Sequence, residues 1–249
     1  MYIAIALANI IIGVLIGISG IAGFLLPMFY TGVYGFMVAD SMAMSFAAFF
    51  VSGIIGAYAY HKSGDIDMSI ALKMGIGSIV GALLGVWCNN MVSVVLAKRA
   101  LFIMVFLSGL LLFKNRPGES EDEAVSSLMS NSTFLVVAGV IIALISSFTG
   151  AGGPVLTVPL LIALGINVRK SVGISLFNSI FIAFPAFLGY SSNATVPNIS
   201  MLIALCMFSH GIGVMFGAKI STKINHKVLK MFVAVVSVLV SCYMFYNTL

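Results

Sequence analysis

Ten apolar segments, most of them about 20 residues long, follow one another along this chain of 249 residues with short polar loops between them. A helix of about 20 apolar residues matches the ~30 Å hydrocarbon core of a bilayer. Only 8% of the residues are charged, against about 25% in an average soluble domain. We therefore expect one all-helical integral membrane unit. The apolar segments cover residues 2–18, 21–37, 42–60, 69–88, 95–113, 132–148, 154–167, 171–189, 198–218 and 228–246.

The most polar stretch of the sequence lies close to its midpoint, between Lys114 and Ser132. It predicts a first membrane repeat over residues 1–116, a cytoplasmic linker over 117–130 and a second membrane repeat over 131–249. A shift of 130 positions supports this division, because it places residues 19–23 on 149–153 and residues 41–45 on 171–175. The sequence thus predicts a five-element helical unit that occurs twice.

The lysines and arginines predict how these units cross the membrane. Five is an odd number of crossings, so the second unit must run in the opposite sense to the first, as an inverted repeat. With both termini outside the cell membrane, every basic residue except Lys98 and Arg99 falls on the cytoplasmic side, as the positive-inside rule expects. The count is the same whether segments 21–37 and 154–167 cross fully or are re-entrant.

Two Gly-rich breaks interrupt the apolar segments at matching places in the two halves, at residues 17–23 and 147–154. Irregular backbone at membrane depth is tolerated only where it lies inside protein or lines a cavity, and paired breaks often mark a carrier's binding site. A helix that starts at such a break offers free amide groups and the positive end of its dipole. Two such helix starts, with nearby hydroxyl groups, suit a small oxyanion.

The candidate substrate-binding residues are the glycines of these breaks and the hydroxyl or amide side chains that follow them. Ser41 and Ser45, like Ser171 and Ser175, are four residues apart, so each pair lies on one face of a helix that the serines begin. Small residues at this spacing are also typical of closely packed membrane helices, and both interpretations stay open. The candidates are Ser19, Gly20, Gly23, Ser41, Ser45, Thr149, Gly150, Gly152, Gly153, Ser171, Ser175 and Asn178.

Few ionisable residues lie in or beside the apolar segments. His210 falls about midway along 198–218, where it could relay a proton or, as a neutral ring, bond to a neighbouring helix. Asp40 is expected to cap a helix start. Arg169 and Lys170 are expected to set the topology, and a cationic pair at a cytoplasmic mouth would also attract anions.

Other chemistries leave no pattern in this sequence. Cys88, Cys206 and Cys242 lie in apolar runs without metal-ligand spacing, and no nucleotide-binding or hydrolase motif is present. We therefore expect no catalytic residues, no metal site and no cofactor. The expected partners are a small anionic solute and the lipid bilayer, without nucleic acid, and homo-oligomerisation stays open.

Residues 149–161, which read TGAGGPVLTVPLL, and residues 170–175, which read KSVGIS, resemble the sulfite exporter TauE/SafE family of membrane permeases. Weaker versions occur at residues 19–27 and 41–45, and the G-x-x-x-G stretches 77–85 and 213–217 are similar to later helices of that family. The resemblance implies secondary transport of a small sulfur-containing anion such as sulfite, an organosulfonate or sulfoacetate.

Taken together, these patterns predict a secondary carrier of a small anion that works by alternating access between two inverted repeats. A carrier of another solute class, such as a small carboxylate or a metal ion, is an alternative. Asp40 is nearly alone as a buried carboxylate, which disfavours a cation. A membrane subunit or enzyme is a further alternative, but a single His without a partnered acid or nucleophile gives it little support.

Overall fold

The structure, a computed structural model, describes most of the two predicted halves. The described positions are residues 1–89, 91, 106, 126–221, 223–225, 228, 231, 234, 235, 238, 239, 242, 243 and 246. The expected segment 95–113 lies outside them apart from residue 106. The same holds for residues 117–125 of the linker and for 228–246 apart from single positions. The halves and linker predicted from the sequence therefore stay a prediction.

The secondary structure of the described residues is helical. Six helices, namely α1, α3, α4, α6, α8 and α9, are long and apolar enough to cross a membrane, which confirms an all-helical integral membrane protein. The elements are α1 (Tyr2–Ser19), η1 (Ala22–Phe24), α2 (Leu25–Tyr34), α3 (Val38–Lys62), α4 (Met68–Asn89), η2 (Ser127–Ser130), α6 (Ser132–Thr149), α7 (Pro154–Ala163), α8 (Val168–Ser191) and α9 (Ile199–Ser221).

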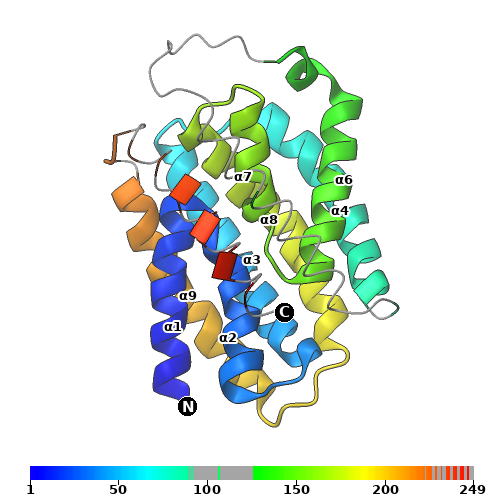
Figure 1. Cartoon of the computed structure of the whole chain (residues 1–249), viewed down its shortest axis with the longest axis vertical. Helices are drawn as coiled ribbons and strands as arrows, with labels where there is room; N and C mark the ends of the chain where they lie inside the picture. Colours follow the sequence, from blue (N-terminus) through cyan, green and yellow to red (C-terminus); the bar gives the residue numbers. More distant parts are fainter. Residues whose placement is uncertain are drawn as a thin grey trace.

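Two of these helices are too short to cross a bilayer. α2 and α7 have 10 residues each, which at ~1.5 Å per residue gives about 15 Å, half of the hydrocarbon core. α1 leads away from the N-terminus, and α2 brings the chain back toward the same end of the bundle (Figure 1). The sequence left open whether these segments cross fully, and the helix lengths favour re-entrant hairpins.

The long helices pack in matched pairs. α1 lies along α9 and α4 along α6, while α3 packs against α8 in the middle of the bundle. α4 also packs against α8, and α3 against α9. α1 and α6 run in opposite directions along the bundle (Figure 1). The α1–α9 contact thus corresponds to the α6–α4 contact, and the α4–α8 contact corresponds to the α9–α3 contact, with the first and second halves interchanged.

Glycines set the distance between the outer helix pairs. A Cβ on Gly17 of α1 would lie 2.7 Å from the amide nitrogen of Ala218 on α9. In the α4–α6 pair, a Cβ on Gly77 or Gly81 would overlap a backbone carbonyl oxygen of α6. Small residues at such contacts let membrane helices approach until their backbones touch.

Two central helices start one turn earlier than the sequence predicted. α8 begins at Val168, because the side chain of Asn167 accepts a hydrogen bond from the amide of Arg169 at 2.9 Å. α3 begins at Val38, although the residue at its N-cap position, Met37, has no capping side chain. The sequence predicted that Ser41 and Ser171 begin these helices, and this prediction is wrong. Each lies one turn inside its helix.

We expect Gly81→Leu to prevent stable folding, because the new side chain would meet the backbone of α6 at Val140. Overpacking a core costs about 1–3 kcal/mol, and a backbone carbonyl cannot turn aside as a side-chain end can. Thermal unfolding in detergent and the yield of monodisperse protein measure the effect. Gly32→Leu on α2 is the control, since a Cβ there meets nothing within 4 Å. Equal losses in both variants would contradict the packing role.

Candidate functional site

Both Gly-rich breaks begin with the same backbone geometry. α1 ends at Gly20 and α6 at Gly150, with φ angles of 76° and 75° in the left-handed region that favours glycine. The amide of Gly20 donates to the carbonyl of Ile16 at 2.7 Å, and that of Gly150 donates to Ser146 at 2.9 Å. The two donors are 130 positions apart, and so are the two acceptors. The shift found in the sequence therefore corresponds to matching backbone structure at this point.

A hydroxyl residue fastens each break to the helix before it. The Ser19 hydroxyl donates to the carbonyl of Leu15 at 2.8 Å and accepts from the amide of Ile21 at 3.3 Å. Thr149 makes the same two bonds, donating to Ile145 at 2.7 Å and accepting from Ala151 at 3.3 Å. Through these two bonds, Ser19 and Thr149 hold the breaks in shape.

Tyrosines support the last turns of α1 and α6. The Tyr60 hydroxyl donates to the carbonyl of Gly17 at 3.1 Å, and the Tyr190 hydroxyl donates to that of Ser147 at 2.7 Å. Both tyrosines are buried within the bundle. Each tyrosine satisfies a carbonyl that has no partner within its own helix.

The carbonyls of the following residues, Ile18 and Phe148, accept hydrogen bonds from side chains of the neighbouring long helices. The Ser221 hydroxyl of α9 donates to Ile18 at 3.1 Å, and the Asn89 side-chain amide of α4 donates to Phe148 at 2.7 Å. The backbone at the end of each helix before a break is therefore paired in both halves.

The two breaks meet in the interior, against α3. A Cβ on Gly23 would lie 2.8 Å from the carbonyl oxygen of Ala151, and a Cβ on Gly20 would lie 3.1 Å from Pro154. The ring of Phe49 lies between the breaks, 3.2 Å from the Cβ position of Gly23 and 3.3 Å from that of Gly152. Residues far apart in the sequence thus come together at one buried point.

Backbone donors without acceptors lie at this meeting point. Among the described residues, no hydrogen bond outside the regular helices uses the amides of Gly152 and Gly153, which are buried just before α7. Pro154, the first residue of α7, has no amide hydrogen to contribute. A helix start with unpaired, buried amides is a ready-made anion site.

Hydroxyls of α8 face the same breaks. Ser175 Oγ lies 3.5 Å from the place that a Cβ on Gly20 would take, and Ser179 Oγ lies 3.5 Å from that of Gly153. Both hydroxyls donate to carbonyls of α8, Ser175 to Val172 at 2.8 Å and Ser179 to Ser175 at 2.9 Å. A hydroxyl can rotate its hydrogen from a helix carbonyl to a ligand, so either residue can contact a bound solute.

The remaining candidates are arranged less closely around this point. Asn178 faces α4, where its side-chain oxygen accepts from Ser78 at 2.8 Å, and its Nδ2 has no partner among the described residues. The Ser45 hydroxyl donates to the backbone carbonyl of Ser41 at 2.7 Å, whereas the side-chain hydroxyl of Ser41 is buried without a described partner. Ser171 donates to Ile166 at 3.3 Å, in the loop that leads from α7 to α8.

His210 is fully buried on α9 and belongs to a polar cluster with α1. Its Nδ1 lies 3.1 Å from the carbonyl oxygen of Asn9, and its ring centroid is 6.2 Å from that of Phe49. Since a carbonyl only accepts, Nδ1 carries the hydrogen, and Nε2, which has no described partner, is the free acceptor of the neutral ring. The bond to a neighbouring helix predicted as one alternative is therefore present, and a proton relay stays a prediction.

Asp40 does not cap its own helix, which corrects the expectation from the sequence. It lies in the first turn of α3 and is fully buried. Its carboxylate accepts from the amides of Thr195 at 2.6 Å and Val196 at 3.1 Å. These amides belong to the α8–α9 loop, where the backbone has left the helix and needs an acceptor from elsewhere. Asp40 thus ties α3 to the end of α8.

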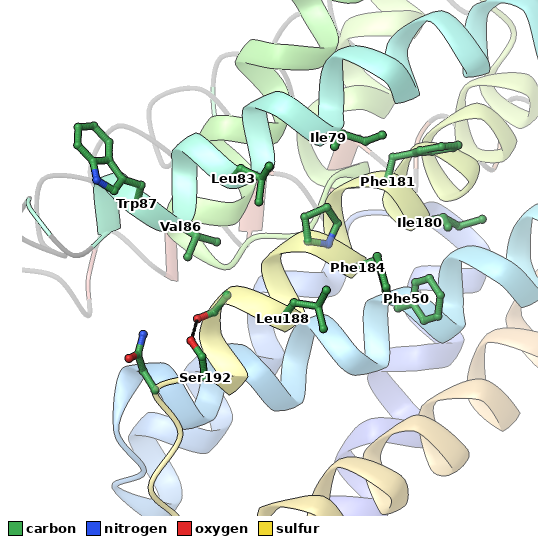
Figure 2. Close-up of a pocket in the computed structure, with 13 residues that line it drawn as sticks. Phe50, Ile79, Leu83, Val86, Trp87, Ile180, Phe181, Phe184, Leu188 and Ser192 are labelled. Carbon is green, nitrogen blue, oxygen red and sulfur yellow. Dashed lines mark hydrogen bonds between the residues drawn. The ribbon is translucent and has the colours of Figure 1, made fainter.

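The chain also contains an apolar cavity of about 930 Å³ between α4 and α8. It is lined by side chains such as Leu83, Phe184 and Leu188, with Ser192 near one end (Figure 2). None of the predicted site residues lines it. The cavity is therefore separate from the point where the breaks meet.

The structure thus brings Gly20, Gly23, Gly152, Gly153 and Ser175 together. The sequence did not single out Phe49 or Ser179. A signal for both existed, since the four-residue spacing from Ser41 to Ser45 continues to Phe49, and the spacing from Ser171 to Ser175 continues to Ser179.

Comparison with known proteins agrees with this architecture. Residues 3–244 match the family described as sulfite exporter TauE/SafE. The chain belongs to this family. It is 26% identical over 226 residues to the probable membrane transporter protein YdhB of Bacillus subtilis (strain 168), covering 89% of each chain. No solved structure matches it.

Two further relatives of this TauE/SafE chain carry similar names. A probable membrane transporter protein of Haemophilus influenzae is 23% identical over 256 residues, which covers 93% of this chain and 95% of the relative. The probable membrane transporter protein MJ0441 of Methanocaldococcus jannaschii is 23% identical over 230 residues, covering 88% and 83%. The similarity therefore extends over whole chains.

We expect Asp40→Ala to destabilise the protein by about 1.5–3 kcal/mol, because hydrogen bonds to a charged group are lost and two loop amides lose their acceptor. Asp40→Asn keeps one accepting oxygen and should cost less. Thermal unfolding in detergent measures both effects. Asp65→Ala is the control, since the Asp65 carboxylate bonds to Ser63 at an exposed turn. An Asp40→Ala variant as stable as the parent would contradict this role.

Proposed function

We propose that this chain is a secondary transporter of a small anion and that the anion binds where the two breaks meet. The observation that carries the proposal is that the amides of the buried residues Gly152 and Gly153, at the start of α7, have no acceptor among the described residues. The positive end of the α7 dipole points to the same place. Ser175 and Ser179 add hydroxyl groups on the facing helix α8.

The chemistry of this point favours an anion over a cation. Amides and hydroxyls donate hydrogen bonds, whereas a metal ion needs oxygen, nitrogen or sulfur atoms that donate electron pairs. The buried carboxylate of Asp40 is occupied by the α8–α9 loop. A carrier of a metal ion is therefore a weaker alternative than a carrier of a small carboxylate, which the same donors could bind.

We further propose that the anion contains sulfur, as sulfite, a sulfonate or sulfoacetate. This part rests on the name of the family. The site is compatible with it, because tetrahedral or pyramidal oxyanions present several acceptor oxygens to converging amides and hydroxyls.

Alternating access between two inverted repeats is the transport mechanism that we propose. It is supported by the opposite directions of α1 and α6 and by the exchange of roles in the helix contacts (Figure 1). The bonds of Tyr60 and Tyr190 to carbonyls 130 positions apart support it as well. Rocking of the two halves about the α3–α8 contact would expose the meeting point of the breaks to each side in turn.

We propose that both termini of the chain face outward. The helix ends that carry Lys62, Arg169 and Lys219 lie at the end of the bundle opposite the N-terminus (Figure 1). A shared basic end is what the positive-inside rule expects of the cytoplasmic side.

His210 is our candidate for a proton relay that couples transport to a proton gradient. Its Nε2 can accept a proton, and its ring lies against Phe49 at the site. Two titratable side chains of the described residues, Cys206 one turn earlier on α9 and Tyr30 of α2, bond to the side chain of Asn9, whose carbonyl meets His210. Their Sγ and hydroxyl oxygen lie 3.2 Å apart.

A ligand screen tests the function directly. We expect sulfite, thiosulfate or sulfoacetate to raise the unfolding temperature of the purified protein, since a ligand at 100 times its Kd stabilises by about 2.7 kcal/mol. Acetate and other plain carboxylates should have no effect. Stabilisation by carboxylates alone would instead support the alternative substrate class.

The site assignment predicts that Gly152→Leu abolishes both the ligand-induced shift and transport. Gly64→Leu is a matched control, because Gly64 has a φ of 79° against 78° for Gly152 but nothing within 4 Å of its Cβ position. Both variants carry similar backbone strain, about 1–2 kcal/mol. Flux into proteoliposomes should persist only in the Gly64 variant, and equal loss in both would count against the site.

The orientation predicts different accessibility at the two ends of the bundle. In a variant whose native cysteines are serines, a cysteine at position 192 should react with a membrane-impermeant maleimide from outside intact cells. A cysteine at position 64 should react only after the cells are opened. Reaction of both from the same side would contradict the topology.

The relay predicts that His210→Gln flattens the dependence of transport on pH, because glutamine cannot take up and release a proton. Ser78→Ala is the control, because the Ser78 hydroxyl lies 3.2 Å from the carbonyl oxygen of Gly139 on α6, the counterpart of the His210 contact with α1. Initial rates of flux at graded pH measure both. A normal pH profile in His210→Gln would remove the relay.

A further inference from the structure

Phe49 occupies the space between the two breaks. Its ring presents one edge to each of them, with Cζ and Cε1 at 3.2 and 3.3 Å from the Cβ position of Gly23 and Cε2 at 3.3 Å from that of Gly152. Any side chain on either glycine would press on this ring. The two glycines therefore leave just enough room for Phe49.

The ring is held differently from its neighbour on the same helix. Phe46 stacks on Tyr190 with parallel planes and a centroid separation of 5.8 Å. Phe49 has glycine on two sides and makes edge contacts with two further rings, Phe46 at 5.7 Å and His210 at 6.2 Å. Glycines offer no side chains that interlock with the ring, so fewer contacts are lost when it turns away.

The two halves differ at this position. The residue 130 places after Phe49 is Ser179 of α8, whose hydroxyl faces Gly153. The second half therefore has a small polar group where the first half has an aromatic ring. Because the two breaks share one meeting point, the single ring of Phe49 borders both of them.

We propose that Phe49 is the gate of the anion site: its ring fills the site in this closed state and must turn away before a small anion can bind. The inference rests on the proposed anion site and goes beyond it, because it names the side chain that controls access and limits ligand size. The ring also separates the meeting point of the breaks from His210, so that its movement would open the site toward that residue.

Thiol labelling tests the gate. In a variant with Cys88, Cys206 and Cys242 changed to Ser, Ser179→Cys places a thiol 130 positions after the gate residue, beside Gly153. Wild-type Ser179 is 2% exposed. The probe is methanethiosulfonate ethylsulfonate, a water-soluble reagent that carries a small sulfonate anion. Added Phe49→Ala should speed the modification about tenfold or more, since labelling of a buried thiol reports how often its cover is absent.

Phe46→Ala is the matched control, because it deletes the same kind of ring one turn earlier on α3, where the ring stacks on Tyr190. It should leave the labelling rate near that of Ser179→Cys alone. Equal acceleration by both variants would mean general loosening of the core and would overturn the gate. No acceleration in folded Phe49→Ala would overturn it too. Should Phe49→Ala fail to fold, Phe49→Leu replaces it; a smaller acceleration is then expected, and its absence would likewise overturn the gate.

The gate and the transport function can fail separately. Labelling does not depend on which solute is carried, so faster labelling in Phe49→Ala with no ligand-induced stabilisation by any anion would retain the gate and reject the anion site. Stabilisation by an anion with unchanged labelling would reject the gate alone. If both hold, Phe49→Ala should also be stabilised by anions larger than those that stabilise the parent protein.

Discussion

Pairing of backbone groups at the two breaks is the constraint on which this structure depends. A helix that stops inside a bilayer leaves carbonyls and amides that water cannot reach, and each costs free energy unless another group pairs with it. Here Tyr60, Tyr190 and side chains from α9 and α4 pair carbonyls in the last turns of α1 and α6. Ser19 and Thr149 accept from the first amides after these helices. Among the described residues, the amides of Gly152 and Gly153 have no acceptor. The same constraint thus fixes the frame and marks the place where a ligand could complete it.

Close packing through glycine brings the breaks to that place. The α1–α9 and α4–α6 pairs touch backbone to backbone, which leaves α3 and α8 to fill the middle and to face both breaks. Long rigid pairs around two short helices provide bodies that can move relative to one another without losing internal contacts. The arrangement is consistent with transport by rocking, as we propose for this member of the TauE/SafE family.

The two halves use corresponding positions for different chemistry. Ser78 of α4 contacts the carbonyl of Gly139 on α6. His210 of α9 contacts the carbonyl of Asn9 on α1, and Asn9 lies 130 positions before Gly139. Phe49 and Ser179 differ in the same way. A repeat fixes where side chains lie, because the backbone geometry is shared, but each position is free to change its chemistry. We infer a division of work in which the second half supplies the donors to the anion and the candidate for proton transfer, and the first half supplies closure.

The sequence by itself determined the membrane class, the helical segments, the paired breaks and the 130-residue correspondence. These features depend on local composition and on spacing along the chain, which hydrophobic length and glycine placement encode directly. The tertiary structure decided the rest: that α2 and α7 are short, that Asp40 binds a distant loop, that Ser19 and Thr149 serve the backbone, and that Phe49 lies between the breaks. Each of these depends on which groups from separate helices meet. Contact between helices is set by packing in three dimensions, and a pattern along one chain does not contain it.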